Sequence, residues 1–254
     1  MKKILLSTRA LAVAVCRYAP GERHARHTDR HSRISLLLRG GYREEGAAGA
    51  IRMGPGDVLL KSARAYHEDE FGDEGAALVA LEFLQDDPFD DHADPQLWRK
   101  RDDAFALRHT ITMLEAALAG DSDTVGAAGD DLMAASGDES GERSAPRWLE
   151  TLKNDLEERT LASVSVGEHA RHAGAHPAHV SRLFRRCYGA SITDFAQTQS
   201  VRRALHALAH TSDPLSAVAI AAGFYDQSHM TRVFRRMTGR TPGAHRAMLA
   251  AALG

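Results

Sequence analysis

The stretch His179-Val180-Ser181-Arg182-Leu183-Phe184-Arg185-Arg186 returns 50 positions later as His229-Met230-Thr231-Arg232-Val233-Phe234-Arg235-Arg236, and each copy closes on a glycine, Gly189 or Gly239. Apolar residues recur in both copies at positions i, i+3, i+4 and i+7, the spacing of one face of an α-helix. They are Val180, Leu183, Phe184 and Cys187, then Met230, Val233, Phe234 and Met237. The repeat therefore predicts two similar helices with arginines on their other faces. Two such helices could bind a polyanion that itself has a helical repeat.

Charge is divided unequally along the chain. The net charge over 254 residues is −2. From residue 146 onward there are 14 lysines and arginines against 8 aspartates and glutamates, a balance of +6, so residues 1–145 carry −8. This asymmetry favours nucleic-acid binding by the C-terminal part alone. The length allows two modest domains, each with a core of its own.

Cysteine use and hydropathy favour a cytoplasmic protein. Cys16 and Cys187 are far apart and form no CxxC motif, which argues against a disulfide framework and fits a reducing compartment. The apolar stretch near the start is broken at residues 7–9, so it is too short for a signal peptide. No apolar run approaches the ~18 residues of a membrane span, and we expect no membrane partner.

The residues around the first copy predict a helix-turn-helix. A first helix opens at Trp148, and Ser165-Val166-Gly167-Glu168 has the S-x-x-E form of a capping box that starts a second helix. After Gly174 another helix begins near Pro177, a residue tolerated in the first turn, and ends at Gly189. A helix, a short glycine turn and an arginine-bearing helix are the parts of this motif.

The same parts recur around the second copy. Asp213-Pro214-Leu215 is predicted to be an N-cap followed by an N1 proline, and Asp226 is predicted to cap the arginine-bearing helix. Between the copies, Ser191 is predicted to cap a helix running to about His210, roughly 17 residues or ~25 Å long. Such a helix could hold the two arginine-bearing helices about one duplex turn apart, ~34 Å, on one side of DNA.

These residues resemble the AraC-type transcriptional regulators over about residues 148–250. The stretch GFYDQSHMTRVFRRMTGRTP, residues 223–242, follows the pattern of that family almost throughout, and residues 173–184 are similar to it. The resemblance implies an all-α DNA-binding domain over residues 148–254 with two helix-turn-helix units. Ser200 stands where the family usually has arginine, and His245 replaces a usual aromatic residue. Both departures concern how the two units are braced.

Exposed positions early in the two helices are the candidates for contacting bases. They are Ala178, Ser181 and Arg182 in the first helix and Gln227, Ser228, Thr231 and Arg232 in the second. Arginine can bind guanine and glutamine can bind adenine, each through two hydrogen bonds. The later arginines Arg185, Arg186, Arg235 and Arg236 are expected to contact phosphates, with a solvated face as the alternative.

Residues 1–85 predict an all-β domain. Short runs at residues 11–17, 34–39, 57–61 and 76–84 are separated by turn signals such as Gly40-Gly41 and Phe71-Gly72-Asp73. The order of elements resembles a cupin, a small jelly-roll barrel. The expected fold class is therefore α+β in several domains, with a cupin-like barrel, a helical connector and the C-terminal all-α domain.

Four histidines of this domain are candidates for binding a metal or an effector: His24, His27, His31 and His67. The cupin resemblance implies a metal held by such histidines, but the tight H-x-H pair of the family is absent. On one strand His24 and His27 would face opposite sides, whereas His27 and His31 could share a face. A non-metal effector pocket is the other interpretation, and Glu68-Asp69-Glu70 is expected to be a solvated turn.

Residues 86–147 are predicted to connect the two domains. Residues 96–118 have the apolar spacing of a long helix, which would serve either packing within the chain or a homodimer surface. Residues 120–147 are rich in Gly, Asp, Ser and Ala, which predicts a flexible linker with at most a weak helix around residues 130–135.

The leading hypothesis is a sequence-specific transcription regulator that binds double-stranded DNA and responds to a small-molecule effector. The alternative is a cupin-type metalloprotein or enzyme fused to a DNA-binding domain. A third is an architectural DNA-binding protein with an inert N-terminal half. The order of residues shows no pairing of a nucleophile with a base, so we expect no enzyme and no required cofactor.

Overall fold

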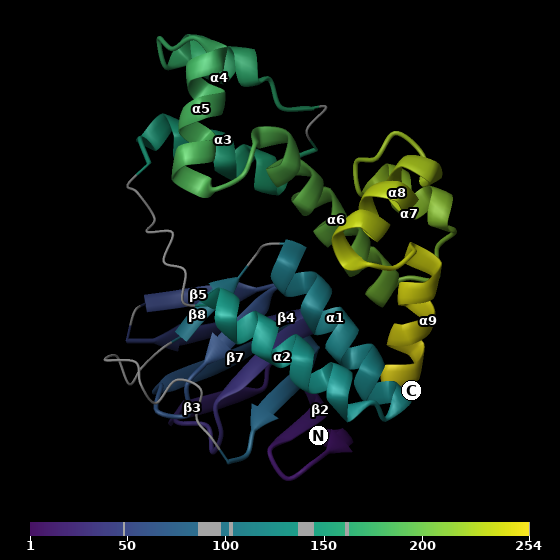
Figure 1. Ribbon diagram of the computed structural model, residues 1–254. Coiled ribbons are helices and arrows are strands. Elements are labelled where there is room, and N and C mark those ends of the chain that lie inside the picture. Colours follow the sequence, from purple (N-terminus) through teal and green to yellow (C-terminus); the bar gives the residue numbers. More distant parts are fainter. Residues whose placement is uncertain (48, 86–97, 102–103, 137–144, 161–162, 254) are drawn as a thin grey trace.

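A β-sheet forms the N-terminal part of the chain and helices form the C-terminal part (Figure 1). The computed structural model describes residues 1–47, 49–85, 98–101, 104–136, 145–160 and 163–253. This arrangement confirms the predicted division into an all-β part followed by a helical part. None of the helices in these ranges has the length and apolar character that crossing a membrane requires.

The strands pair in antiparallel fashion in the order β1-β2-β7-β4-β6-β8, with β3 added to β7 and β5 to β4. Their bounds are β1 (Lys2–Ser7), β2 (Leu11–Tyr18), β3 (Arg23–His27), β4 (Arg33–Gly46), β5 (Gly49–Met53), β6 (Val58–Lys61), β7 (His67–Phe83) and β8 (Trp98–Arg101). The predicted runs at 11–17 and 57–61 match β2 and β6 closely. Charged β1 and β3 lack the alternation of apolar residues by which a strand is recognised in a sequence.

Two predicted turns are instead bends inside long strands. Gly40-Gly41 lies within β4, and Phe71-Gly72-Asp73 lies within β7. The pairing of β4 with β7 shifts register between Leu37 and Arg39 and again between Gly40 and Tyr42. Gly40 has φ 75°, and a Cβ there would overlap the carbonyl oxygen of Gly75. Glycine is therefore required by the close approach of two strands, and it curves them without ending them.

The connector differs from its prediction at both ends. The helix expected from residue 96 begins at Ala104 as α1 (Ala104–Ala119), and residues 98–101 form β8 against β6. The predicted linker contains the helix α2 (Ser122–Ser136), where only a weak helix was expected. Buried Val125, Ala128 and Leu132 explain this, because α2 packs against the sheet and α1 despite its polar composition. Residues 137–144 of the predicted linker lie outside the described residues.

The C-terminal helices are α3 (Arg147–Glu158), α4 (Val166–His172), α5 (Pro177–Tyr188), α6 (Ile192–His210), α7 (Leu215–Ala221), α8 (Gln227–Thr238) and α9 (Pro242–Leu253). We call α4 and α5 the first helix pair, and α7 and α8 the second helix pair. The long helix α6 connects the two pairs (Figure 1). Its 19 residues span about 28 Å at the α-helical rise.

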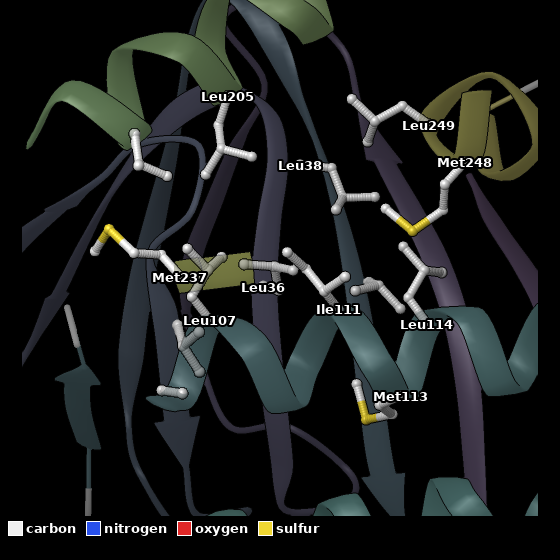
Figure 2. Close-up of a cluster of buried hydrophobic side chains, with 14 of the residues drawn as sticks. Leu36, Leu38, Leu107, Ile111, Met113, Leu114, Leu205, Met237, Met248 and Leu249 are labelled. Carbon is white, nitrogen blue, oxygen red and sulfur yellow. The ribbon is translucent and has the colours of Figure 1, made fainter. Parts of the chain in front are cut away.

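The two helix pairs belong to different cores. The first pair packs with α3 and the start of α6 in a cluster that contains no residue of the sheet. The second pair shares one large cluster with the sheet, α1, α2, α6 and α9. In Figure 2, Met237 of α8 and Leu205 of α6 approach Leu107 of α1 and Leu36 of β4. The second pair is thus docked on the N-terminal part, whereas the first pair is not part of that core.

The apolar face of α1 is occupied within the chain. Leu107, Ile111 and Leu114 are buried in the shared core. This is the packing role expected for the connector helix. A homodimer through the same helix stays a prediction, and it would have to use other faces of α1.

Polar contacts join the second pair and its neighbours to the N-terminal part. Arg202 Nη1 of α6 lies 2.5 Å from Oδ1 of Asp57, whose side chain is almost fully buried. The amide of Gly40 donates to Nε2 of His210 at 3.1 Å. Ion pairing between Arg240 and Glu115 adds a contact to α1. These contacts fix the second pair beside the sheet.

Candidate nucleic-acid interface

Both arginine-bearing helices begin and end at the residues expected from their sequence. Asp226 accepts a hydrogen bond from the amide of His229 at 2.7 Å at the start of α8. His176 is the N-cap of α5, and its Nδ1 accepts from the amide of Ala178 at 3.2 Å. Gly189 and Gly239 follow the last turns with φ of 72° and 80°. Left-handed glycines of this kind end helices without steric cost.

Other predicted helix starts agree in part. Ser165 and Ser191 cap α4 and α6 as expected, each accepting from an amide three residues on. The predicted cap Asp213 is wrong, because Pro214 is the N-cap of α7 and no side chain closes that end. The carbonyl of Asp213 accepts instead from Arg246 of α9 at 2.7 Å.

The first helix pair presents its predicted base-contacting residues to solvent. Val180, Phe184 and Cys187 are buried on the inner face of α5. The opposite face carries the exposed residues Ala178, Ser181 and Arg182. The Ser181 hydroxyl donates to the carbonyl of Pro177 at 3.1 Å, which leaves its oxygen free to accept a hydrogen bond.

The second helix pair has the same division between faces. Met230, Val233 and Phe234 are buried, while Gln227, Ser228 and Arg232 are exposed and Thr231 is half-buried. Thr231 donates its hydroxyl to the carbonyl of Gln227 at 2.8 Å, as Ser181 does 50 positions earlier. The structure therefore places each predicted set of base-contacting residues together on one outer face of its helix.

A groove of about 740 Å³ follows α8. The side chains that line it are Arg108, Gln227, Ser228, Thr231, Arg232, Arg235 and Arg236. Only Arg108 comes from the N-terminal part, and its guanidinium donates to the carbonyl of Arg236. Sequence reasoning missed Arg108, because nothing in the pattern of α1 indicates that it lies beside α8. The groove gathers three guanidinium groups of α8 and one of α1, which suits a polyanion.

The four late arginines differ in their surroundings. Arg185, Arg186, Arg235 and Arg236 are all exposed near the ends of α5 and α8. Arg236 also donates to Oε1 of Gln197 on α6. That contact ties the end of α8 to the connecting helix.

Near Ser200, where the sequence departs from the family pattern, Arg203 braces α3 against the end of α7. Its Nη2 donates to the Ser200 hydroxyl oxygen at 3.1 Å, and its Nε donates to the carbonyl of Ala222 at 3.2 Å. Its Nη1 lies 3.4 Å from the carbonyl oxygen of Glu157 on α3. The guanidinium of Arg203, three residues from Ser200, thus contacts α3 and the residue that follows α7.

His245, the second departure, is buried beside Phe234. The two rings meet edge to face with centroids 5.5 Å apart. Burial, with a smaller contribution from Arg240, lowers the pKa of His245 from 6.5 to about 4. His245 is therefore neutral near pH 7 and occupies the place of an aromatic side chain.

A second group of polar side chains lies in the N-terminal part and includes three of the four predicted histidines. His24 Nδ1 lies 3.5 Å from Oδ2 of Asp69. Nε2 of His27 and Nε2 of His67 each lie 3.9 Å from the same oxygen. A register shift between His24 and His27 brings both rings to one side, so the expectation that they face opposite sides is wrong.

His31 does not join this group. Strand β3 ends at His27, so His27 and His31 do not share one strand. Among the described residues, no group of potential metal ligands contains His31. The expected solvated turn at Glu68-Asp69-Glu70 is also wrong, because Asp69 is 6% exposed within β7. At this end of β7 burial alternates, so that His67 and Asp69 are buried while Glu68 between them is exposed.

Lys61 is buried beside the histidine group. Its Nζ lies 3.0 Å from Glu44 Oε1, 3.2 Å from Asp29 Oδ2 and 2.8 Å from His67 Nε2. Burial and the Lys61 ammonium lower the pKa of His67. Burial would raise the pKa of Asp29, but the cations Arg33 and Lys61 outweigh it and lower that pKa. The ammonium thus occupies the lone-pair side of His67, where a metal ion would otherwise bind.

The C-terminal part matches known proteins in sequence. Residues 169–248 match a family model described as a helix-turn-helix domain. The chain is 31% identical over 86 residues to the arabinose operon regulatory protein of Escherichia coli, covering 34% of this chain and 30% of that protein. The same protein of Salmonella typhimurium is 35% identical over 78 residues, covering 31% of this chain and 28% of that protein. The chain thus spans about 30% of the length of these relatives. The match confirms the resemblance of the C-terminal part to AraC-type regulators.

Solved structures give a weaker likeness. The DNA-binding domain of AdpA in complex with a target DNA is 27% identical, with 42% of this chain and 96% of that chain covered and a TM-score of 0.38. ToxT from Vibrio cholerae O395 is 9% identical, with 95% and 99% covered and a TM-score of 0.40. Both TM-scores are below 0.5, so the likeness to these two structures does not establish how the parts of this chain are arranged.

Proposed function

We propose that this protein is a transcription regulator of the AraC type that binds double-stranded DNA through both α5 and α8. The observation that carries the proposal is the matched division of the two helices. In each, an apolar stripe is buried and the residues at equivalent positions, Ser181 with Arg182 and Thr231 with Arg232, lie on the outer face. A solvated face would not need two helices that match in their C-terminal glycines and in the hydroxyl hydrogen bonds of Ser181 and Thr231.

Each helix pair acts as one helix-turn-helix unit, and α6 sets the distance between the units. About 28 Å of helix separates them, close to the ~34 Å of one duplex turn. Arg203 of α6 contacts Glu157 of α3, which packs with the first unit, and Ala222 at the end of α7 in the second unit. One chain can therefore place two helices in successive major grooves on one side of the duplex.

The structure supports distinct roles for the exposed residues. Arg182 and Arg232 bind guanine edges and Gln227 binds adenine. Ser181 and Thr231 donate to their own helices, so they accept hydrogen bonds from base amino groups. Ser228 adds a further polar contact, and Ala178 offers a methyl contact to thymine. Phosphates are contacted by Arg185, Arg186 and Arg235, with Arg236 contributing when its bond to Gln197 gives way.

The N-terminal part is proposed to be a cupin-like barrel that binds a small effector at the polar group around Asp69. Asp69 is 6% exposed, and its Oδ1 has no hydrogen-bond partner among the described residues. A buried carboxylate oxygen without a partner is costly, which favours a ligand that supplies a donor or a cation. A regulator of this kind works in the cytoplasm without enzyme activity of its own, and a homodimer is compatible with it.

A metal is the second candidate for the same group. His24, His27 and Asp69 place one ligand atom each within 4.8 Å of one another, which fits three protein ligands of a divalent ion. His67 fits less well, because Lys61 already contacts its Nε2. These residues would then hold the ion, and the chain would be a metalloprotein joined to a DNA-binding domain.

The DNA proposal is tested by fluorescence anisotropy of the full chain on a bound duplex and on a scrambled one. Arg182→Ala and Arg232→Ala should each reduce the preference for the bound sequence by ~1 to 3 kcal/mol, while Arg9→Ala at an exposed site of the N-terminal part should change nothing. Unchanged preference in both variants would contradict the assignment.

A further inference from the structure

Three potential metal ligands meet where α6 lies against the sheet, apart from the histidine group of the N-terminal part. His206 and His210 are one turn apart on α6, and their rings stack with centroids 4.1 Å apart. Glu74 belongs to β7, and its Oε2 lies 3.3 Å from Nε2 of His210. One ligand atom from each residue lies within 4.8 Å of the others. Two histidines at i and i+4 are a recurrent zinc-binding arrangement on a helix.

The hydrogen bonds of His210 fix which ring nitrogen faces this group. Nδ1 lies 2.7 Å from the carbonyl oxygen of His206, so it carries the proton and donates it. Nε2 then has a lone pair, which accepts from the amide of Gly40 at 3.1 Å. The same nitrogen lies 3.3 Å from Oε2 of Glu74, and a carboxylate oxygen is likewise a hydrogen-bond acceptor. The two acceptor atoms, Nε2 of His210 and Oε2 of Glu74, repel each other, whereas a cation between them would be attracted to both.

His206 is suited to be the third metal ligand beside Glu74 and His210. Its ring stacks on that of His210 one turn away, and its side chain is exposed, so a ring nitrogen is accessible to an ion. A neutral imidazole can donate a lone pair to a metal without first losing a proton.

We propose that Glu74, His206 and His210 form a binding site for one divalent transition-metal ion such as zinc. Two imidazoles and one carboxylate suit zinc, cobalt or nickel better than calcium or magnesium, which prefer oxygen ligands. Water supplies the fourth position of a tetrahedral site. Binding weakens the bond from Gly40 to His210, which is the one protein contact that the ion displaces from Nε2.

The site joins two parts of the chain. Glu74 comes from the sheet, whereas both histidines come from the helix that connects the two helix pairs. An ion that binds only when α6 lies against the sheet stabilises that arrangement, and the stabilisation grows with the logarithm of the ratio of its concentration to the dissociation constant. Metal binding would therefore strengthen the docking of α6 without touching the DNA-contacting residues.

The test is a titration of chelator-treated full-length protein with Co²⁺, followed by visible absorption, and competition with Zn²⁺. The background variant His24→Ala/His27→Ala removes the two histidines that could bind an ion together with Asp69, and we expect it to keep the binding equivalent of the α6 site. In this background His206→Ala and Glu74→Gln should each weaken binding at least about tenfold, because even outer-sphere changes cost 10- to 100-fold. Glu74 is largely exposed, so its variant should fold normally.

The control is His109→Ala, which removes a histidine of α1 that contacts only Asp131 among potential ligands. It should leave Co²⁺ binding unchanged. Hydrogen exchange should slow around residues 72–76 and 204–210 on adding Zn²⁺ to the background variant, and should not do so after His206→Ala. Absence of a binding equivalent in the background variant would overturn the site. Equal affinity in the background variant with and without His206→Ala would overturn it as well.

Discussion

The first and second helix pairs share a sequence repeat but differ in what surrounds them. Phe184 of the first pair is buried in a cluster made only of α3 to α6 and the residues between them. Phe234, its counterpart 50 positions later, is buried in a cluster that also contains the sheet, α1 and α2. The repeat thus determines helix ends and exposed faces, while residues outside it decide which pair contacts the N-terminal part.

This difference has a functional consequence. A change in the sheet that displaces α1 would reach α8 directly, since Arg108 and Glu115 of α1 contact Arg236 and Arg240. Among the described residues, α5 lies in a separate cluster with α3, α4 and the start of α6, so the change would reach α5 through α6. We therefore expect an effector to act first on the second helix pair, and the first pair to bind DNA independently of the N-terminal part.

The largest expected effect comes from removing the two phenylalanines one at a time. Phe184→Ala and Phe234→Ala should each cost about 3–5 kcal/mol, because both side chains are fully buried. Hydrogen exchange should rise only in residues 147–196 after Phe184→Ala. After Phe234→Ala it should also rise in α1 and the sheet. The same exchange pattern in both variants would contradict the separation of the two cores.

A smaller effect is expected from the ion pair that docks α6. Arg202→Met leaves Asp57 without its guanidinium partner in a buried position, and should lower the free energy of unfolding by about 2–3 kcal/mol. Arg182→Met on the exposed face of the first pair is the matched control and should stay within about 0.5 kcal/mol. Urea unfolding of both variants measures the difference, and equal midpoints would refute the role of this pair in docking.

A third prediction uses an aromatic contact at matching positions in which one ring is phenylalanine and the other histidine. Phe195 meets Phe184 edge to face in the first pair, and His245 meets Phe234 in the same way 50 positions later. The folded pKa of His245 is about 4 against 6.5 when unfolded, so the unfolded chain takes up the proton first as pH falls. Stability from this residue is full above pH 6.5 and is lost as pH falls toward 4, amounting to about 2 kcal/mol by pH 5.

His245→Phe should remove this part of the pH dependence and copy the contact of the first pair. Its Nδ1 has no hydrogen-bond partner among the described residues, so the substitution should also stabilise the protein at pH 7. Denaturant midpoints at pH 7.5 and pH 5 give the measurement. An unchanged difference between the two pH values would show that other groups carry it.

The sequence predicted the C-terminal part better than the N-terminal part for physical reasons. Helix caps, apolar stripes and left-handed glycines are local, so Asp226, Gly189 and Gly239 could be assigned from short windows. The histidine group around Asp69 could not, because a register shift in β3 and the pairing of β3 with β7 bring its members together. The sequence predicted only a weak helix where α2 forms, because α2 is stabilised by the tertiary burial of Val125, Ala128 and Leu132.

The packing of α8 against α1 could not be predicted from the sequence either. Apolar residues of α1 and of α8 each showed helical spacing, but nothing in either pattern identified the other as its partner. Likewise Arg203 could not be recognised as the brace, because its acceptors at Glu157 and Ala222 are backbone carbonyls. Long-range contacts between elements leave no periodic trace in the sequence.

The central claim is that α5 and α8 contact two separate segments of one DNA site. Selection of bound sequences from random duplexes of about three helical turns by the full chain tests it most directly. We predict two recurring blocks with centres about 10 base pairs apart, one erased by Arg182→Ala and the other by Arg232→Ala. A single block, or loss of the same block in both variants, would contradict it.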